Sequence, residues 1–285
     1  MSQNPAHRSP ITRRRRPHAR IPTFGSICRL IREDLGLSLV KAYTRHGIAK
    51  STLADIENGF LPTLETVDRI IAGYEVDPLM ARHLRELLAP AEDLPPTDNL
   101  RQCVRERTAA VVHLRDLDDR GVLAAYIDPL WNMLACNESF RAAVPGLTEN
   151  EQIHTWLFSP PARNYFLDWP SEATHAVASS KTILGRYRDS TQAQDFMQIL
   201  GQNPEFVDFW TASIRVAYGR NTGDLVHVRD PATGEPVSYS LSISNVTQTE
   251  HVLLVTAIRK PYSGPAPDHP RHPRDTLHDT PIAFG

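Results

Sequence analysis

Residues 38–59 contain two short helical patterns separated by a single glycine, Gly47. Glycine can adopt the positive φ that a tight turn between two steeply crossing helices requires. The next residue, Ile48, is apolar and is expected to be buried, and Leu53 and Ile56 follow at the spacing of one helix face. This combination predicts a helix-turn-helix, which constrains the fold of the surrounding chain more than any other feature of the sequence.

Apolar residues at helical spacing continue on both sides of this motif. Ser38 and Thr63 are suited to be N-caps, and Pro78 is suited to the first position of a helix. Five helices are expected, and they begin at about Phe24, Ser38, Ile48, Thr63 and Asp77. Residues 24–89 are therefore predicted to form an all-α domain.

The second helix of the motif has a polar outer face, which in a helix-turn-helix protein meets base edges in the major groove of DNA. The residues expected to contact DNA from this domain are Lys41, Arg45, Lys50, Ser51, Thr52, Asp55 and Asn58. Asp55 can accept a hydrogen bond from a cytosine amino group. The alternative is a helical domain that binds protein instead of DNA.

Six arginines and no acidic residue precede Phe24, and Arg13, Arg14, Arg15 and Arg16 are consecutive. Residues 24–90, by contrast, carry eight Lys or Arg against nine Asp or Glu. A cationic arm on a nearly neutral domain indicates a polyanionic partner, and we expect residues 1–23 to be a disordered arm that contacts DNA phosphates. The alternative is a tail that only improves solubility.

Proline-rich stretches divide the rest of the chain. Residues 90–100 are predicted to be a linker, and residues 261–285 a disordered tail rich in proline and histidine. Between them, residues 101–260 begin with a helix over about 100–117 and a hairpin of 121–127 with 131–136. A mainly helical region follows, and then strands at 224–229, 236–246 and 251–259. This order predicts an α+β domain with an antiparallel sheet.

The first domain resembles the Xre and phage-repressor family of helix-turn-helix proteins. The likeness rests on Ile48-Ala49-Lys50-Ser51-Thr52-Leu53, on Ile56-Glu57-Asn58-Gly59, and on Pro62-Thr63 before the next helix. The sequence departs from the family at Leu39, where glutamine is usual. This resemblance implies a regulator that binds double-stranded DNA.

The second domain resembles the ligand-binding domain of MmyB-like regulators, which follows an Xre-type domain in many bacterial transcription factors. The landmarks are Ala125-Tyr126-Ile127-Asp128, Trp131-Asn132-Met133-Leu134-Ala135, Asn137, Trp156-Leu157-Phe158, Pro161-Ala162-Arg163, Tyr165, Asp168-Trp169, Phe206, Phe209-Trp210, Asp230-Pro231 and Gly234-Glu235. The resemblance implies a PAS-like fold around a cavity for fatty-acid-like or other apolar molecules. Asp230 stands where the family commonly has histidine.

All four tryptophans fall in this second domain, together with several other aromatic residues. Ring faces can line an apolar cavity, or large side chains can simply fill a core. The residues expected to bind a ligand are Trp131, Trp156, Tyr165, Phe166, Trp169, Phe206 and Trp210.

The sequence contains no nucleophile elbow, P-loop, glycine-rich dinucleotide turn or zinc-ligand spacing, so we expect neither an enzyme nor a metal site or cofactor. The three cysteines are expected to be reduced thiols. No apolar run is long enough to span a bilayer, and we expect a cytoplasmic, nucleoid-associated protein with no membrane partner.

Together these features predict a homodimeric transcription regulator that reads DNA and is controlled by a small apolar effector. The alternative is a ligand-independent adaptor whose second domain is a protein-docking or dimerisation module.

Overall fold

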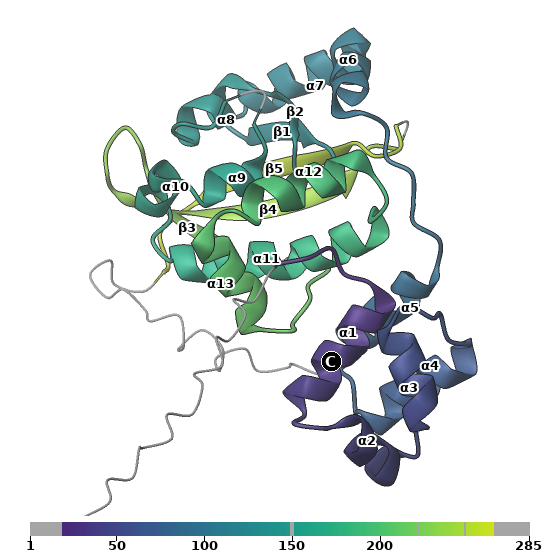
Figure 1. Ribbon diagram of the computed structural model, residues 1–285. Helices are drawn as coiled ribbons and strands as arrows, with labels where there is room; N and C mark the ends of the chain where they lie inside the picture. Colours follow the sequence, from purple (N-terminus) through teal and green to yellow (C-terminus); the bar gives the residue numbers. More distant parts are fainter. Residues whose placement is uncertain (1–18, 149–150, 222, 248, 265–285) are drawn as a thin grey trace, which may run out of the picture.

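The computed structural model describes residues 19–148, 151–221, 223–247 and 249–264. Over these residues the chain forms thirteen helices and five strands. The first five helices form one body, which we call the head (residues 24–88), and the remaining elements form a second domain (residues 97–264) (Figure 1). Arg13 to Arg16 and the tail beyond 264 lie outside the described residues.

Local capping interactions set the helix boundaries in the head. Ser38 accepts a hydrogen bond from the N–H of Lys41 at 3.2 Å, and Thr63 caps the fourth helix, as the sequence predicts. Asp77 caps the fifth helix, whose first residue is Pro78. The helices are α1 (Phe24–Asp34), α2 (Leu39–His46), α3 (Lys50–Glu57), α4 (Leu64–Gly73) and α5 (Pro78–Leu88).

The helices of the second domain surround its sheet. The expected single helix over 100–117 is instead two helices, because Arg107 leaves the helical conformation at φ −84° and ψ 99°. The helices are α6 (Thr97–Glu106), α7 (Thr108–Asp118), α8 (Glu138–Ala143), α9 (Ile153–Leu157), α10 (Pro160–Tyr165), α11 (Trp169–Arg186), α12 (Thr191–Leu200) and α13 (Pro204–Ala212).

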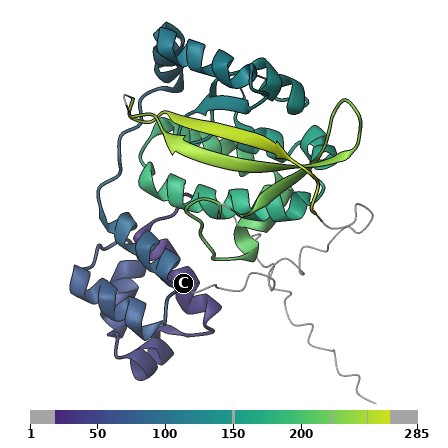
Figure 2. The ribbon, with the colours of Figure 1, turned by 180° about the vertical axis from the view of Figure 1, so that it is seen from behind.

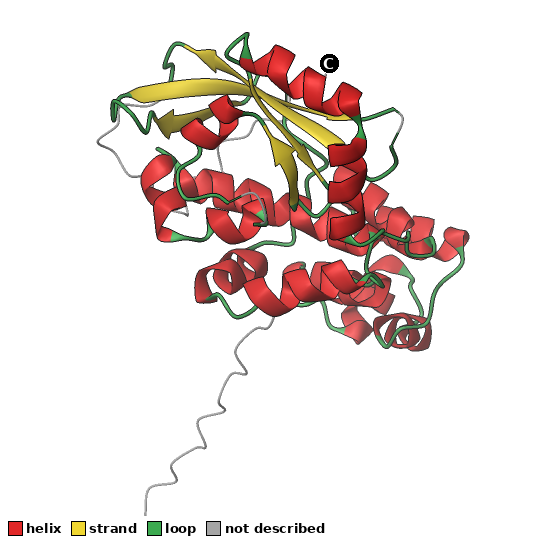
Figure 3. Cartoon of the chain, turned by 90° about the horizontal axis from the view of Figure 1, so that it is seen from above, coloured by secondary structure: helices red, strands yellow, loops and turns green. Residues whose placement is uncertain are grey.

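The sheet is antiparallel throughout and confirms the predicted α+β class. Its strands are β1 (Leu123–Ile127), β2 (Met133–Cys136), β3 (Leu225–Arg229), β4 (Pro236–Asn245) and β5 (Leu253–Lys260), in the order β2-β1-β5-β4-β3. The last strand therefore lies in the centre and joins the early hairpin to the late strands. Viewed from above, the strands form a single layer and the rest of the described chain is helix and loop (Figure 3). From behind, no described helix lies in front of β4 and β5 (Figure 2).

All five residues of β1 are buried. Because side chains alternate along a strand, Ala124 and Tyr126 belong to one apolar cluster, whereas Leu123 and Ala125 belong to another. β1 is thus packed on both of its faces.

Asn137, a buried residue after β2, connects β1 to α8. Its side-chain oxygen accepts hydrogen bonds from the N–H groups of Ala124 (3.1 Å) and Phe140 (3.0 Å). Its amide nitrogen donates to the carbonyl oxygen of Val122 at 2.8 Å. One side chain therefore caps α8 and accepts a hydrogen bond from a backbone N–H group of β1.

Replacing Asn137 with alanine should destabilise the second domain by about 2–4 kcal/mol, because it leaves buried backbone groups without partners. The measurement is urea denaturation followed by tryptophan emission, which reports this domain because all four tryptophans lie in it. Asn245→Ala, at the exposed end of β4, is the matched control and should change the free energy of unfolding by less than about 0.5 kcal/mol. Equal losses in the two variants would contradict the assignment.

Candidate nucleic-acid interface and aromatic core

The turn between α2 and α3 has the geometry that the sequence predicts. Gly47 adopts φ 68° and ψ 13°, and its N–H donates to the carbonyl oxygen of Tyr43 at 2.9 Å. Ile48 is buried directly after it, and Leu53 and Ile56 are fully buried on the inner face of α3. The helix-turn-helix is therefore confirmed.

All seven head residues predicted to contact DNA are exposed. Lys50, Ser51, Thr52 and Asp55 lie on α3, and Asn58 follows at its end. Lys41 and Arg45 lie on α2. No side-chain hydrogen bond caps α3, because its N-cap is Ala49. Backbone N–H groups in the first turn of a helix attract anions such as phosphate.

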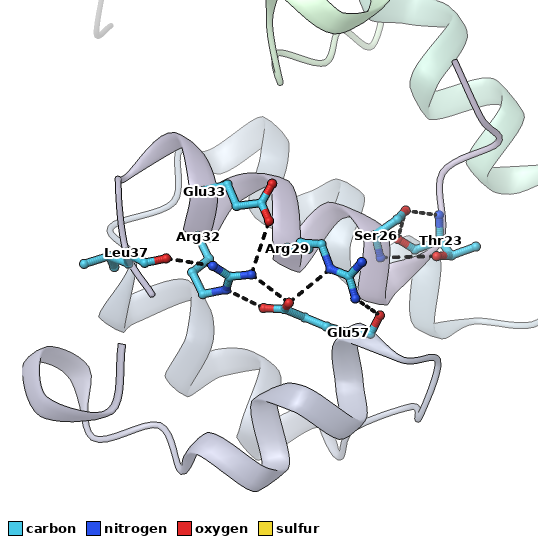
Figure 4. A network of polar contacts seen from close by, with 7 residues as sticks. All are labelled: Thr23, Ser26, Arg29, Arg32, Glu33, Leu37 and Glu57. Atoms are coloured by element: carbon cyan, nitrogen blue, oxygen red, sulfur yellow. Dashed lines mark hydrogen bonds and ion pairs between the residues drawn. The ribbon is translucent and has the colours of Figure 1, made fainter. Parts of the chain in front are cut away.

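A buried carboxylate, Glu57, fixes the end of α3 to α1 (Figure 4). Arg32 donates to both of its oxygens, from Nε at 2.6 Å and from Nη2 at 2.8 Å. Arg29 donates to Oε2 at 3.1 Å and to the Glu57 carbonyl oxygen at 3.0 Å. Arg32 also reaches the carbonyl oxygen of Leu37, just before α2. The network thus ties α3 and the start of α2 to one helix.

The two arginines of this network differ in exposure. The side chain of Arg32 is 9% exposed and that of Arg29 is 47% exposed, against 4% for Glu57. The hydrogen bonds to Glu57 raise the pKa of Arg32 above its ordinary value. A buried ion pair with several hydrogen bonds fixes the relative positions of the segments that it joins, here α1 and α3, more than it adds to the free energy of unfolding. The sequence interpretation missed these residues, although Glu57 belongs to the Ile-Glu-Asn-Gly sequence quoted for the Xre resemblance.

Gly25 allows α1 to approach α3 closely. A Cβ atom at this position would lie 2.2 Å from the carbonyl oxygen of Ile56. Only glycine fits this contact without movement of the backbone. The position of α3 therefore depends on both the ion pair and this close approach.

The aromatic residues predicted to bind a ligand do not gather at one place. Trp156 and Tyr165 are buried in one apolar cluster. Trp169, Phe206 and Trp210 are buried in another, and Phe166 packs against both. Trp131 is half-buried, and its ring lies 5.4 Å from that of His154, with the backbone at φ 64°.

The rings in these clusters contact one another edge-on or at a tilt. Trp156 lies 5.8 Å from Tyr165, and Phe206 lies 5.4 Å from Trp210, measured between ring centroids. The indole N–H of Trp156 donates to the carbonyl oxygen of Pro145, and that of Trp169 donates to Leu157. Trp156 and Trp169 are therefore core side chains whose indole N–H groups have hydrogen-bond partners.

None of the seven predicted residues lines either of two pockets in the described part of the chain. One, of about 240 Å³, lies between β2 and α8. The other, of about 800 Å³, lies between the linker and the start of α12 and has an acidic lining. The smaller pocket is lined by Met133, Cys136, Phe140, Arg141, Val144, Leu147 and Thr148.

Residues 213–218, which we call the connecting segment, follow α13 and run along α11. The N–H of Ala217 donates to the carbonyl oxygen of Ala178 at 3.1 Å, and Thr182 donates to that of Ala217 at 2.9 Å. The ammonium group of Lys181 donates to the carbonyl oxygen of Ser213. Burial lowers the pKa of Lys181 to about 8. The backbone of this segment thus belongs to the second domain.

The side chains of the connecting segment belong to the head. Val216 is buried within the apolar core of the head, and Ile214 and Tyr218 pack against that core. The hydroxyl of Tyr218 donates to Glu86 at 2.6 Å, and the guanidinium of Arg82 lies 3.8 Å from the centre of its ring. The sequence interpretation missed this segment, which has neither a helical nor a strand pattern.

Among the residues that the structure describes, no group of three or more His, Cys, Asp or Glu side chains could hold a metal ion. The three cysteines are free, and burial raises the pKa of the Cys28 thiol to about 12. Within the described chain, no helix is both long and apolar enough to cross a bilayer.

Comparison with known families gives two matches. Residues 107–264 match the MmyB-like transcription regulator ligand binding domain. Residues 29–79 match the helix-turn-helix family. No curated protein matches the chain. The two matches follow the order of the two domains.

The two arginines that bind Glu57 should contribute differently to the stability of the head. Arg32→Met should destabilise the head by about 3 kcal/mol, because it leaves a buried carboxylate partly unpaired. Arg29→Met should cost at most about 1 kcal/mol, because that pair is half exposed. Thermal unfolding followed by circular dichroism measures both. Arg29→Met serves as the matched control, and equal effects would show that the network does not hold α3 in place.

Proposed function

Since the chain belongs to the family of regulators with an MmyB-like ligand-binding domain, it is a DNA-binding transcription regulator, and we propose that a small apolar effector controls its head. In this proposal α3 reads a specific operator and the second domain, with a PAS-like fold, binds the effector. The effector then changes the affinity of the head for DNA.

The observation that carries the proposal is the connecting segment. Its backbone is hydrogen-bonded to α11 of the second domain, while Val216 is buried in the core of the head. A change in the packing of α11 or α13 therefore acts on the head directly. Coupling between two sites requires an element whose arrangement both sites influence, and this segment fits that description.

For DNA, we propose that Lys50, Ser51, Thr52 and Asp55 meet base edges and that Lys41, Arg45 and Asn58 contact the backbone of the duplex. The exposure of all seven supports this assignment. Since the head is nearly neutral, phosphate neutralisation depends mainly on the arginine arm, including Arg13 to Arg16.

For the effector, the apolar pocket between β2 and α8 supports an apolar molecule. Met133, Phe140 and Val144 line it and belong to the same core cluster as Trp156 and Tyr165. We propose that the effector enters at this pocket and displaces ring contacts in the aromatic core. The predicted aromatic lining would then be reached only in the bound state.

We further propose a homodimer, because one head reads few base pairs and a two-fold protein matches a palindromic operator. The protein is proposed to act in the cytoplasm on the nucleoid, without catalysis of its own. A ligand-independent adaptor is the alternative outcome of the tests below.

Lys50→Ala should weaken binding to a duplex selected by the protein from a random library. The expected cost is about 1–3 kcal/mol, with relaxed preference at one base position. Fluorescence anisotropy titration measures the affinity, and circular dichroism checks the fold. Arg105→Ala is the control, since it removes an exposed charge on α6, far from α3 (Figure 1). Unchanged affinity in Lys50→Ala would contradict the assignment of α3.

Native mass spectrometry of the full chain, purified from its own host, should reveal a retained small apolar molecule. Adding that molecule to the stripped protein should change DNA affinity by about 5–150-fold. Val216→Ala should still bind the molecule, but the ratio of its DNA affinities with and without the molecule should fall toward one. Its control, Val104→Ala, truncates a buried valine on α6 in the other apolar cluster and should keep the response.

Three results would count against effector control. One is a chain that carries no small molecule, and another is DNA affinity that ignores the molecule it carries. The third is a Val216→Ala variant that responds as the wild type does, which would remove the connecting segment from the mechanism. The first two results would favour the adaptor.

A further inference from the structure

The head contacts the second domain a second time, between α5 and α11. At Gly185 on α11, a Cβ atom would lie 2.8 Å from Cε1 of His83 and 2.9 Å from Cδ2 of Leu87. The two helices therefore approach as closely as they do only because position 185 is glycine. The imidazole ring of His83 fills the space that any larger side chain would need.

His83 is the unusual member of this contact. It is 1% exposed, and neither ring nitrogen has a hydrogen-bond partner. A buried polar group without a partner costs free energy, and water would satisfy both nitrogens if the helices separated. The contact between α5 and α11 is therefore weakened by the free energy of burying these two nitrogens, and separation of the two helices removes this cost.

The charged groups around His83 do not favour its protonation while it is buried. Burial lowers its pKa to about 4, and the ammonium group of Lys181 on α11 acts in the same direction. Glu86, on the same helix as His83, opposes them. That carboxylate is already engaged by Tyr218 of the connecting segment and by Arg82, and Arg186 of α11 lies 4.0 Å away.

We propose that His83 and Gly185 form an acid-sensitive latch: the head docks on α11 while the imidazole is neutral, and it undocks when the ring takes up a proton. Undocking separates α5 from α11 and also withdraws Val216 of the connecting segment from the core of the head, and this releases the fixed orientation of α3 relative to the second domain. The latch deepens the proposed function, because it gives the head a second control besides the effector. Docking itself can be measured without DNA or effector, so the two proposals can fail separately.

The sign of the pH dependence follows from linkage. Burial in the docked arrangement lowers the pKa of His83 to about 4, and in the proposal the exposed ring of the undocked head has the ordinary value of 6.5. Docking is then at full strength above pH 6.5 and weakens as pH falls toward 4. Between pH 7.5 and 5.0 the docking equilibrium constant should fall about 30-fold. Lys181, with a pKa of about 8, is mostly protonated at pH 7.5 and gains its remaining charge by about pH 7, so its titration is complete before that of His83 begins to weaken docking strongly.

Small-angle X-ray scattering of the full chain at pH 7.5 and pH 5.0 tests the latch through the radius of gyration. The wild type should be compact at pH 7.5 and expanded at pH 5.0. His83→Ala should stay compact at both values, because it lacks the titrating ring. His175→Ala is the control, since burial also lowers the pKa of His175 to about 4, and this residue lies on α11 ten residues before Gly185 and is not among the groups nearest to that glycine. It should expand at pH 5.0 as the wild type does.

Gly185→Ala should be expanded at both pH values, because its methyl group meets the ring of His83. Adding His83→Ala to it removes the nearer of the two obstructing groups and leaves Cδ2 of Leu87, so the double variant should be more compact than Gly185→Ala at both values. Near-ultraviolet circular dichroism confirms that each variant is folded. A wild type that stays compact at pH 5.0, an expanded His83→Ala at that pH, or a double variant as expanded as Gly185→Ala overturns the proposal.

Discussion

The connecting segment gives the two domains a shared core, and the relation between sensing and DNA reading depends on this feature. Hydrogen bonds to Ala178 and Thr182 hold its backbone on α11, while Val216 completes the core of the head. A linker alone would leave the head free to rotate. The shared segment instead makes the orientation of the head a property of how α11 and α13 pack.

Within the head, the position of α3 depends on contacts at its far end. Glu57 is held by Arg29 and Arg32, and Gly25 lets α1 approach the carbonyl oxygen of Ile56. Lys50, Ser51 and Thr52 at the start of α3 contribute little to this fixation, because they are exposed. The head therefore separates the residues that hold the helix from those proposed to read the operator.

Much of the head could be predicted from the sequence, because its signals are local. Gly47, Ile48 and the caps at Ser38 and Thr63 act over one helical turn, and each has the predicted role. The sequence also predicts the strands, but it does not predict their order. The position of β5 between β1 and β4 depends on pairing between segments that are far apart in the sequence, and local patterns do not mark such pairing. The predicted aromatic residues divide between the two clusters that pack on opposite faces of β1. The Glu57 network and Val216 were missed because no periodic pattern marks contacts between distant segments.

The proposed control of the head by the second domain is reciprocal, since a coupling free energy acts in both directions. Binding of DNA to α3 must then alter the connecting segment. Hydrogen exchange of the full chain, with and without a selected duplex, measures this directly. The account predicts slower exchange in α3 and also in residues 213–218, where the N–H of Ala217 is bonded to α11. Protection confined to the head, with unchanged exchange in residues 213–218, would contradict it.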